Sequence, residues 1–332
     1  MKKPSILVCR RVFPEILERL AAHFEVEANQ ADDEWSRDET ITRLQGKDGA
    51  FITSTNPIDA TVLERCPQLR AIATMSVGYN NVDVAACTAR GVTFSNAPGV
   101  LTETTADFGF ALLLAAARRV TESEHFLRRG DWTKWTIDLF AGSDVHGATL
   151  GVLGMGRIGQ GVARRGALGF GMKVIYHNRS RLDAAIESEL GARYVGRDEL
   201  LRDCDHLVIV VPYSAASHHL VGAPELALMK PTATLVNIAR GGIVDDVALA
   251  AALREGRIAA AGLDVFEDEP TVHPDLLALK NVVLTPHIAS ASYPTRRAMA
   301  GLAAQNLICM LDPAATTAPP TLLNPDALSH RV

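Results

Sequence analysis

The stretch "TLGVLGMGRIGQGVARRGALGFGMKVIYHNRS", residues 149–180, carries the strongest structural signal in this 332-residue chain. An apolar run is followed by Gly154, Gly156 and Gly159 in the spacing G-x-G-x-x-G, then by a helical segment starting near Arg157 and a second apolar run. This order is typical of a dinucleotide-binding unit. The first glycine permits the tight turn, the second lets the backbone approach a pyrophosphate, and the third allows close helix–strand packing. The helix N-terminus then presents free N–H groups to the phosphates.

The second apolar run ends at Tyr176, where such units often place an acid that binds the adenosine ribose, about 20 residues after the third glycine. This chain has Asn178, Arg179, Ser180 and Arg181 there instead. A carboxylate would repel a 2′-phosphate, whereas a guanidinium pairs with two phosphate oxygens, at about 1.5–3 kcal/mol for each charged hydrogen bond. The stretch therefore predicts NADP(H) as the preferred cofactor, with NAD(H) as an alternative. The competing interpretation is that both arginines are ordinary solvated charges.

Short apolar runs alternate with longer amphipathic segments along nearly the whole chain, which indicates parallel strands joined by helices. We predict an α/β protein with two Rossmann-like domains and parallel sheets. The dinucleotide-binding domain (101–289) is inserted into a flavodoxin-like substrate-binding domain (1–100 and 290–332). The expected strands are 5–9, 24–28, 49–53, 70–75, 92–95, 149–153, 172–176, 206–211, 233–238, 259–264 and 282–285, and the expected helices include 14–22, 82–90, 102–129 and 294–311. The Pro-rich tail that follows cannot form a regular helix.

Composition excludes several classes of protein. The chain is 48% hydrophobic and 21% charged, with a net charge of −5 and dispersed basic residues, which argues against nucleic-acid or membrane-surface partners. The first apolar run is stopped by Arg10 and Arg11, too early for a signal peptide, and the longest apolar helical stretch (108–117) is too short to span a membrane. The five cysteines are scattered, with no C-x-x-C pair, and are expected to be small buried residues. We expect a soluble, cytoplasmic protein without a bound metal.

Polar residues follow the ends of three predicted strands of the second domain. Arg240 lies in "NIARGG", Asp264 and Glu269 lie in "GLDVFEDEP", and His287 lies in "TPHIASAS". Ligands of open parallel sheets bind beyond the carboxyl ends of the strands, so we expect these side chains near the nicotinamide end of the cofactor. Taken singly, each has an ordinary interpretation as a surface charge, a turn residue or a structural histidine.

Together, these residue types supply what the reduction of a 2-oxo acid requires. An arginine holds the substrate carboxylate in a bidentate pair and polarises the neighbouring carbonyl. A histidine delivers a proton to the carbonyl oxygen as hydride reaches the carbon. A carboxylate beside the histidine orients the ring and favours its protonated form.

With these motifs, the chain resembles the D-2-hydroxyacid dehydrogenase family over nearly its whole length. The resemblance rests on "SVGYNNVD" (76–83), "TETTADFGFALLL" (102–114), "GMGRIG" (154–159), "NIARGG" (237–242), "GLDVFEDEP" (262–270) and "TPHIASAS" (285–292). Within the family, "VLTETTAD", "DVHGATLGVLGMGRIG" and "HNRSR" resemble the bacterial glyoxylate/hydroxypyruvate reductases, also described as 2-ketogluconate reductases.

The resemblance implies roles for individual residues. Arg240 is the carboxylate clamp, His287 the acid/base and Glu269 its partner, and the backbone N–H groups of Val77 and Gly78 also bind the substrate carboxylate. Asp264 is expected at the nicotinamide carboxamide and Pro212 on the adenosine side. The complete set expected at the cofactor is Gly154, Met155, Gly156, Arg157, Ile158, Gly159, Asn178, Arg179, Ser180, Pro212, Ile238, Ala239, Asp264 and Thr105.

The resemblance also implies a homodimer in which segment 120–147, with Trp132 and Trp135, is the exchanged arm. Packing in the dimer is the favoured role of the two tryptophans over shaping of the substrate site. Asn178 departs from the NAD-using relatives, which have Asp at this position; the departure affects the cofactor and not the reaction class.

We therefore expect an NADPH-preferring reductase of glyoxylate and hydroxypyruvate, with 2-ketogluconate as a further candidate substrate. Two alternatives stay open. One is another enzyme on the same scaffold: a phosphoglycerate, formate or phosphite dehydrogenase. The other is a dinucleotide-sensing, corepressor-like binding protein. Phosphoglycerate dehydrogenases resemble Arg-Ser-x-Thr where this chain has Thr53, Ser54, Thr55 and Asn56, which carry no positive charge for a substrate phosphate.

Overall fold

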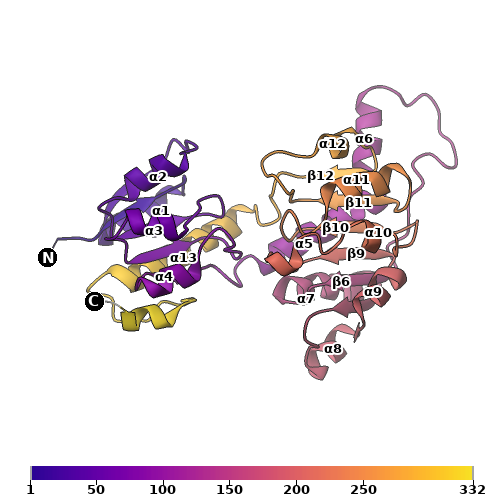
Figure 1. Cartoon of the computed structure of the whole chain (residues 1–332). Coiled ribbons are helices and arrows are strands. Elements are labelled where there is room, and N and C mark those ends of the chain that lie inside the picture. Colours follow the sequence, from indigo (N-terminus) through magenta and orange to yellow (C-terminus); the bar gives the residue numbers. More distant parts are fainter. Residues whose placement is uncertain (1, 331–332) are drawn as a thin grey trace. The chain divides into compact units, whose positions relative to one another are not determined.

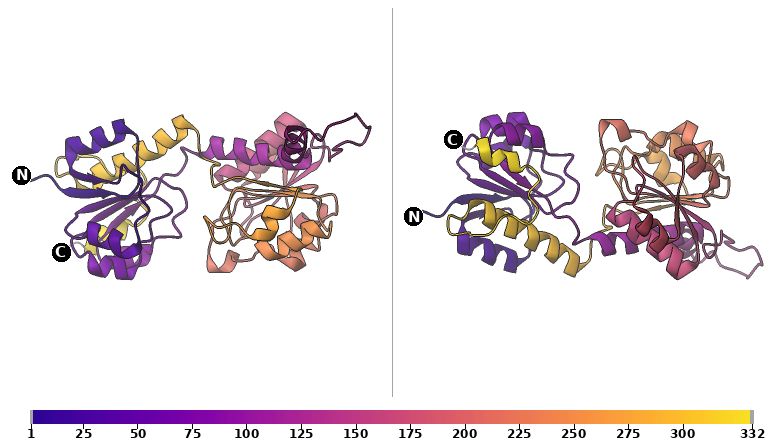
Figure 2. Two further views of the ribbon diagram at one scale, coloured as in Figure 1. Left: turned by 90° about the horizontal axis from the view of Figure 1, so that it is seen from above. Right: turned by 90° about the horizontal axis from the view of Figure 1, so that it is seen from below.

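The computed structural model describes residues 2–330, which form two compact units (Figure 1). Unit 1 comprises residues 2–101 and 292–330, and unit 2 comprises residues 102–291. Each unit is built around one parallel sheet, and helices cover both faces of each sheet (Figure 2). The predicted α/β class with two parallel sheets is confirmed.

Unit 1 contains a five-stranded sheet in the order β2-β1-β3-β4-β5, the order of flavodoxin-like folds. Its strands are β1 (Ser5–Val8), β2 (Glu25–Ala28), β3 (Gly49–Ile52), β4 (Ala71–Thr74) and β5 (Thr93–Ser95). Its helices are α1 (Pro14–His23), α2 (Arg37–Leu44), α3 (Ala60–Arg65), α4 (Val84–Ala89) and α13 (Tyr293–Leu311), with a 3₁₀ turn, η3 (Pro325–His330). Both central strands, β3 and β4, are buried along their whole length, as expected where helices cover both faces.

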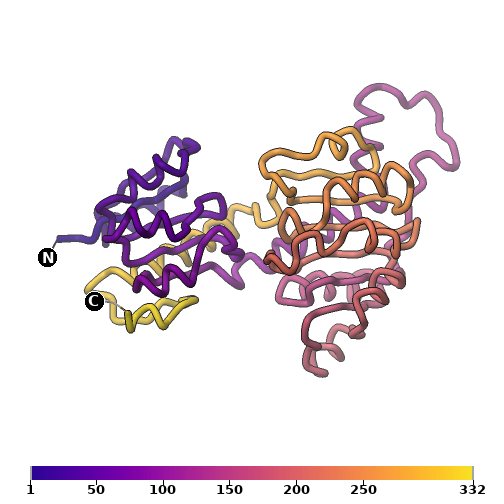
Figure 3. The backbone as a smooth tube through the Cα atoms, viewed as in Figure 1, coloured from indigo at the N-terminus to yellow at the C-terminus, as the bar shows by residue number. Residues whose placement is uncertain are grey.

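The tail after α13 packs against strand β5 of the same unit, and Figure 3 shows it beside the N-terminal elements. Leu323 N–H donates to the Phe94 carbonyl at 2.9 Å, and Asn324 Oδ1 accepts from Phe94 N–H at 2.7 Å. These bonds satisfy backbone groups of the edge strand β5 that would otherwise be open to another chain.

Unit 2 contains a seven-stranded sheet in the order β12-β11-β10-β9-β6-β7-β8. Its strands are β6 (Thr149–Leu153), β7 (Lys173–His177), β8 (Ala192–Tyr194), β9 (His206–Ile209), β10 (Thr234–Asn237), β11 (Ala260–Leu263) and β12 (Val282–Leu284). Its helices are α5 (Thr102–Ala117), α6 (Val120–Arg128), α7 (Arg157–Arg164), α8 (Ala184–Leu190), α9 (Arg197–Asp203), α10 (Ala223–Leu226), α11 (Asp246–Arg254) and α12 (Pro274–Ala278), with a π-helical turn η1 (Arg165–Gly169) and a 3₁₀ turn η2 (Ala215–Ser217). The strand order reverses at β6, between β7 and β9, and such a switch point is where dinucleotides bind.

The predicted single helix over 102–129 is wrong. The chain forms two helices, α5 and α6, because Arg119 adopts a left-handed backbone (φ 53°) between them. The carbonyl of Ala117 accepts a 2.9 Å hydrogen bond from Ser143 N–H and is drawn out of the helical ladder. Helix α5 buries one face against the sheet, whereas α6 has no buried residue. The break thus separates a core helix from an exposed one.

Strand β8 and the partial exposure of one cysteine were not predicted from the sequence. For β8 the reason is that three residues at a sheet edge give too short an apolar signal. Four of the five cysteines are buried as expected, and burial raises the pKa of Cys9, Cys87 and Cys204 to about 12. Cys309 is only half-buried. No helix within residues 2–330 is both long enough and apolar enough to cross a membrane.

Candidate active site

The glycine loop joins β6 to α7, and two of its glycines are sterically required. Gly154 has a left-handed backbone (φ 102°), and a Cβ there would lie 2.8 Å from the backbone of Val210 and Val211. A Cβ on Gly159 would lie 2.2 Å from the Gly154 carbonyl oxygen, so only glycine allows α7 to pack this closely on the loop. A Cβ on Gly156 would meet no atom within 4 Å. Gly156 therefore borders open space at the start of α7, where a phosphate can approach the backbone.

Asn178 has a structural partner in the same loop. Its side-chain Oδ1 accepts a 2.6 Å hydrogen bond from Met155 N–H, and its backbone carbonyl accepts from the Tyr194 hydroxyl at 3.1 Å. Asn178 thus ties the end of β7 to the middle of the glycine loop. The sequence predicted only a role toward the ribose and missed this bond.

The residues present fit a dinucleotide. Besides the open space at Gly156, Thr105 near the start of α5 is 4% exposed, and its hydroxyl has no hydrogen-bond partner among residues 2–330. A buried hydroxyl without a partner is costly, and a ligand polar group would satisfy it. Ile238 and Ala239 follow β10 and are buried, and Pro212 follows β9, with its carbonyl accepting from Ser217 at 3.0 Å. Of the remaining predicted contacts, Met155 is buried, Ile158 is half-buried and Arg157 is exposed.

The basic stretch after β7 contains two arginines in different situations. Arg181 forms a bidentate ion pair with Glu187 of α8, at 2.9 Å from Nε and 2.7 Å from Nη2. This pairing, with a hydrogen bond from Tyr176, lowers the pKa of Glu187 to about 2. Arg179 and Ser180 are exposed, and no ion pair of Arg179 is found within the described part of the chain. Arg181 is therefore already engaged, and Arg179 is the cation available to a ligand.

His287 and Glu269 are brought together by the loops after β12 and β11. Nδ1 of His287 lies 2.7 Å from Oε2 of Glu269, and Oε1 of the same carboxylate accepts a 2.9 Å hydrogen bond from Phe266 N–H. His287 has a left-handed backbone (φ 53°), a conformation that costs about 1–3 kcal/mol in a non-glycine residue and that clusters at functional sites. With Nδ1 engaged, Nε2 is the ring nitrogen left to exchange a proton with a substrate.

The pKa of Glu269 is set by its neighbours in the site. Burial by itself would raise the pKa of this carboxyl. The hydrogen bond and charge of His287, the Phe266 N–H and the Arg240 guanidinium outweigh burial and lower it. Glu269 is therefore an anion at neutral pH.

Arg240 lies just beyond β10 and is half-buried. Burial lowers the pKa of its guanidinium, and the Glu269 carboxylate opposes that shift. Its Nη1 donates to the Ala239 carbonyl at 2.7 Å, while the Asn237 side chain donates to the Arg240 carbonyl at 3.2 Å. A Cβ on Gly241 would lie 1.6 Å from the Phe266 carbonyl oxygen, so only glycine lets this turn press against the loop that carries Glu269.

Asp264 is 1% exposed and holds the loop of His287 in place. Its Oδ1 accepts from the Thr285 hydroxyl at 2.7 Å and from Ile288 N–H at 2.8 Å, and its Oδ2 accepts from Ala289 N–H at 2.7 Å. These bonds give Asp264 a positioning role, and the nicotinamide contact that the resemblance implies for it stays a prediction. Sequence reasoning missed the positioning role because the partners lie more than 20 positions away.

In unit 1, Val77 and Gly78 lie in the loop after β4 and are half-buried. The loop is held by Asn96, whose side chain donates to the Val77 carbonyl at 2.8 Å, and by Ala97 N–H, which donates to the Ser76 carbonyl at 3.0 Å. Within residues 2–330, the amides of Val77 and Gly78 donate no hydrogen bond. Two unpaired amides at a fixed turn are suited to an anion.

The chain is similar to known proteins over most or all of its length. Residues 110–289 match the family described as D-isomer specific 2-hydroxyacid dehydrogenase, NAD binding domain. The chain is 48% identical to a glyoxylate reductase of Aeropyrum pernix, covering 100% of this chain and 99% of that protein. It is 46% identical to a glyoxylate reductase of Thermococcus onnurineus, covering 99% and 98%.

A solved structure is also similar over the full length. It is an NADPH-dependent glyoxylate/hydroxypyruvate reductase from Sinorhizobium meliloti in complex with NADP and malonate. The TM-score is 0.85 at 34% identity, covering 100% of this chain and 99% of that one.

Proposed function

The chain belongs to the family of D-isomer specific 2-hydroxyacid dehydrogenases, and from this premise we propose that it reduces glyoxylate and hydroxypyruvate to 2-hydroxy acids, with NADPH as the preferred reductant. The observation that carries the proposal is the His287–Glu269 pair beside Arg240, at the carboxyl ends of three adjacent strands. Relatives named glyoxylate reductase over the full length support the substrate class. We include 2-ketogluconate as a further candidate substrate.

The chemistry divides among the side chains of this chain. When bound, the nicotinamide supplies the hydride. Arg240 holds the substrate carboxylate in a bidentate pair, which orients the 2-oxo carbon and polarises its carbonyl. His287 donates the proton from Nε2 to the carbonyl oxygen, and Glu269 stabilises the protonated ring through Nδ1. Asp264 keeps His287 in place by holding residues 285–289. In unit 1 we propose the amides of Val77 and Gly78 as anion-binding groups for substrate.

The preference for NADPH rests on Asn178 and Arg179. Asn178 provides no charge to repel a 2′-phosphate, and Arg179 is an exposed guanidinium two residues past β7. The NADPH-dependent relative from S. meliloti supports the assignment. NADH remains the alternative cofactor.

The preference for substrates without a phosphate rests on the loop after β3. Asn56 Oδ1 accepts from Thr53 N–H at 3.0 Å, and the hydroxyls of Thr53 and Thr55 lie 2.9 Å apart. These groups hold the loop and offer hydroxyls but no positive charge. They therefore disfavour a phosphoglycerate-type substrate.

We also propose that the protein forms a homodimer through segment 120–147. Several large apolar side chains of this segment are exposed, with Trp132 at 55%, Trp135 at 73% and Ile137 at 89%. Contiguous exposed apolar side chains mark association surfaces. Light scattering on the purified protein tests this proposal: twice the chain mass supports it, and a monomer at micromolar concentration contradicts it.

The test of the activity is the loss of NADPH absorbance with glyoxylate and with hydroxypyruvate, each repeated with NADH. Turnover of both acids with a higher kcat/KM for NADPH supports the proposal. Binding of NADPH without turnover of either acid would instead indicate a dinucleotide-sensing protein. Turnover with NADH only would retain the reaction and reject the cofactor preference.

A further inference from the structure

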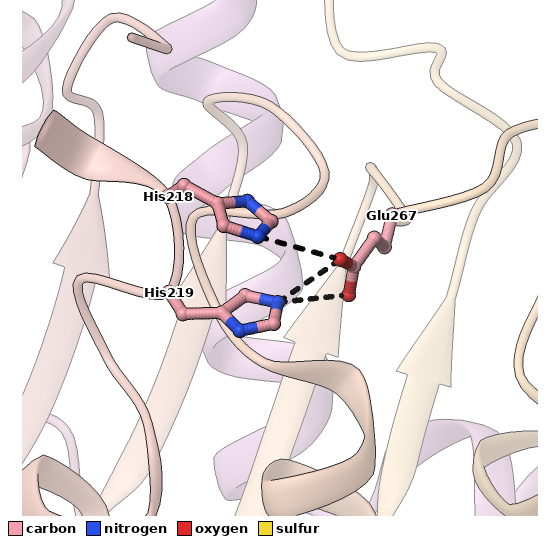
Figure 4. A group of neighbouring side chains, drawn as sticks. All are labelled: His218, His219 and Glu267. Carbon is pink, nitrogen blue, oxygen red and sulfur yellow. Dashed lines mark hydrogen bonds and ion pairs between the residues drawn. The ribbon is translucent and has the colours of Figure 1, made fainter. Parts of the chain in front are cut away.

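His218, His219 and Glu267 form a second histidine–carboxylate cluster in unit 2, where the sequence predicted no metal site. His219 Nε2 lies 3.0 and 3.1 Å from the two oxygens of Glu267, and His218 Nε2 lies 3.9 Å from Oε1 (Figure 4). One ligand atom from each residue lies within 4.8 Å of the others. Figure 4 shows both rings directed toward the carboxylate.

The backbone brings both rings to the same side. Neighbouring residues of an extended chain point in opposite directions, but His219 has a left-handed backbone (φ 49°), and the two rings stack with centroids 4.0 Å apart. His219 N–H donates to the Gly242 carbonyl at 2.7 Å, which holds this turn against the loop after β10. A left-handed non-glycine residue is uncommon and persists when its surroundings hold it.

The ring nitrogens that face away from Glu267 also have partners. His218 Nδ1 lies 3.2 Å from the Tyr213 hydroxyl, and His219 Nδ1 lies 3.8 Å from an oxygen of Asp245. A histidine that binds a metal through Nε2 carries its proton on Nδ1. This N–H usually donates a hydrogen bond to a carboxylate or another acceptor. Both histidines thus have an acceptor near the nitrogen that would carry the proton, which leaves both Nε2 atoms for an ion.

We propose that His218, His219 and Glu267 bind a divalent transition ion of the zinc class, outside the catalytic residues. Two imidazoles and one carboxylate are a common ligand set for zinc, with the remaining position open to water. Bond lengths of about 2.0–2.2 Å place tetrahedral ligand atoms about 3.4 Å apart, and the two nitrogen–oxygen separations here are 3.0 and 3.9 Å. The three ligand atoms already lie within 4.8 Å of one another, so small side-chain shifts would complete the site.

The site would join two loops at the same edge of the sheet. His218 and His219 belong to the loop after β9, and Glu267 belongs to the loop after β11, which also carries Glu269. Glu267 is itself held at the backbone, where its N–H donates to Asp246 at 3.2 Å. A bound ion therefore crosslinks the loop beside the proposed cofactor pocket to the loop of the catalytic carboxylate, and it stabilises the folded protein by mass action.

The test measures zinc binding to the full-length protein after removal of metals, by competition with a chromophoric chelator. We expect one Zn²⁺ per chain. The variants His219→Asn, His218→Gln and Glu267→Gln should each weaken binding at least about 10-fold, the scale of losing a supporting group at a metal site. Asparagine at 219 tolerates the left-handed backbone and removes only the imidazole.

Two controls keep the test specific. His125→Gln removes an exposed histidine that also lies near a glutamate (3.8 Å from Glu124), and it should bind zinc like the unaltered protein. His287→Ala identifies zinc held at the catalytic pair. Unchanged affinity in His219→Asn, a loss in His287→Ala alone, or the absence of a tight site in the unaltered protein each overturns the proposal. A zinc-induced rise in Tm that is absent from a folded His219→Asn variant supports it.

Discussion

Glu269 and Glu267 stand two positions apart in one loop, and each holds a histidine. By exposure the two pairs are alike: each histidine side chain is 36% exposed and each glutamate 32%. Their nitrogen–oxygen distances, 2.7 and 3.0 Å, are also similar. The pairs differ in their neighbours. Glu269 faces a single histidine and the Arg240 guanidinium, whereas Glu267 faces two stacked imidazoles with Asp245 behind one of them.

These neighbours determine the chemistry of each pair. An arginine beside the first pair attracts an anionic substrate and leaves one imidazole to transfer a proton. A second imidazole beside the second pair adds a neutral nitrogen ligand and makes a cation the better-matched occupant. A histidine–glutamate contact by itself is therefore uninformative about function, and the third residue distinguishes the two proposed functions.

The largest effect should follow from removing the imidazole of His287, the proposed general acid. His287→Ala should lower kcat for glyoxylate by about 100-fold or more, because general acid catalysis is lost, while NADPH binding is retained. It should also keep the zinc site, which uses other residues. Steady-state kinetics and zinc competition on the same preparation check both expectations, with His125→Gln as the control for kcat. Loss of zinc binding together with turnover would mean that the two pairs are one functional unit.

A smaller effect, on cofactor binding, is expected for the two arginines after β7, which differ in their neighbours. Arg179→Ala should raise KM for NADPH by about 10-fold with little change for NADH, the cost of one charge-assisted hydrogen bond to a 2′-phosphate. Arg181→Ala is the matched control, because Arg181 is engaged with Glu187. Equal weakening of both cofactors by Arg179→Ala, or a larger NADPH-specific loss in Arg181→Ala, would exclude Arg179 as the residue that binds the phosphate.

A negative charge at position 178 tests the same proposed binding site with the opposite sign of charge. Asn178→Asp keeps an oxygen for Met155 N–H but adds a negative charge. It should lower kcat/KM for NADPH by about 10-fold and favour NADH, because a carboxylate repels a 2′-phosphate and accepts hydrogen bonds from a ribose. Measured kcat/KM values for both cofactors decide this, and an unchanged ratio would argue against a 2′-phosphate at this position.

The charge of the substrate should change kcat/KM by a factor of similar size. The kcat/KM for 3-phosphohydroxypyruvate should be at least about 10-fold below that for hydroxypyruvate, because the phosphate adds about −1.5 to −2 charges. Thr53, Ser54, Thr55 and Asn56 carry no positive charge to offset them. Side-by-side kinetics on the two acids provide the test, and near-equal values would reveal a cation that binds the phosphate.

The sequence predicted best where the determining contacts are local. Gly154 and Gly159 lie five positions apart, in the glycine loop and the first turn of α7, and their steric roles follow from the glycine spacing alone. The predicted continuous helix failed because the break depends on Ser143, which bonds Ala117 from 26 positions away (143 − 117). Arg181 looked equivalent to Arg179 until α8 placed Glu187 beside it.

The sequence did not predict the His218–His219–Glu267 cluster, for the same reason. The adjacent histidines are visible in the sequence, but Glu267 is 48 positions from His219. The left-handed turn that aligns the two rings has no sequence signal. The strand ends located Arg240, Glu269 and His287, whereas the bonds of Asp264 to the His287 loop required the fold.

The smallest expected effect is a change in the pH dependence of the rate, and it tests the His287–Glu269 pair directly. Because the pKa of Glu269 is lowered, its carboxylate stays charged well into the acid range and favours the protonated form of its partner. Reduction needs that proton, so the rate should fall as pH rises and His287 loses it. Glu269→Gln keeps the shape and removes the charge that favours a proton on the ring, so this alkaline limb should move to lower pH. The measurement is kcat/KM for glyoxylate across pH, with Glu255→Gln, an exposed carboxylate paired with Arg257, as the control. An active Glu269→Gln enzyme with an unmoved alkaline limb would show that Glu269 only positions the ring and contributes no charge to its protonation.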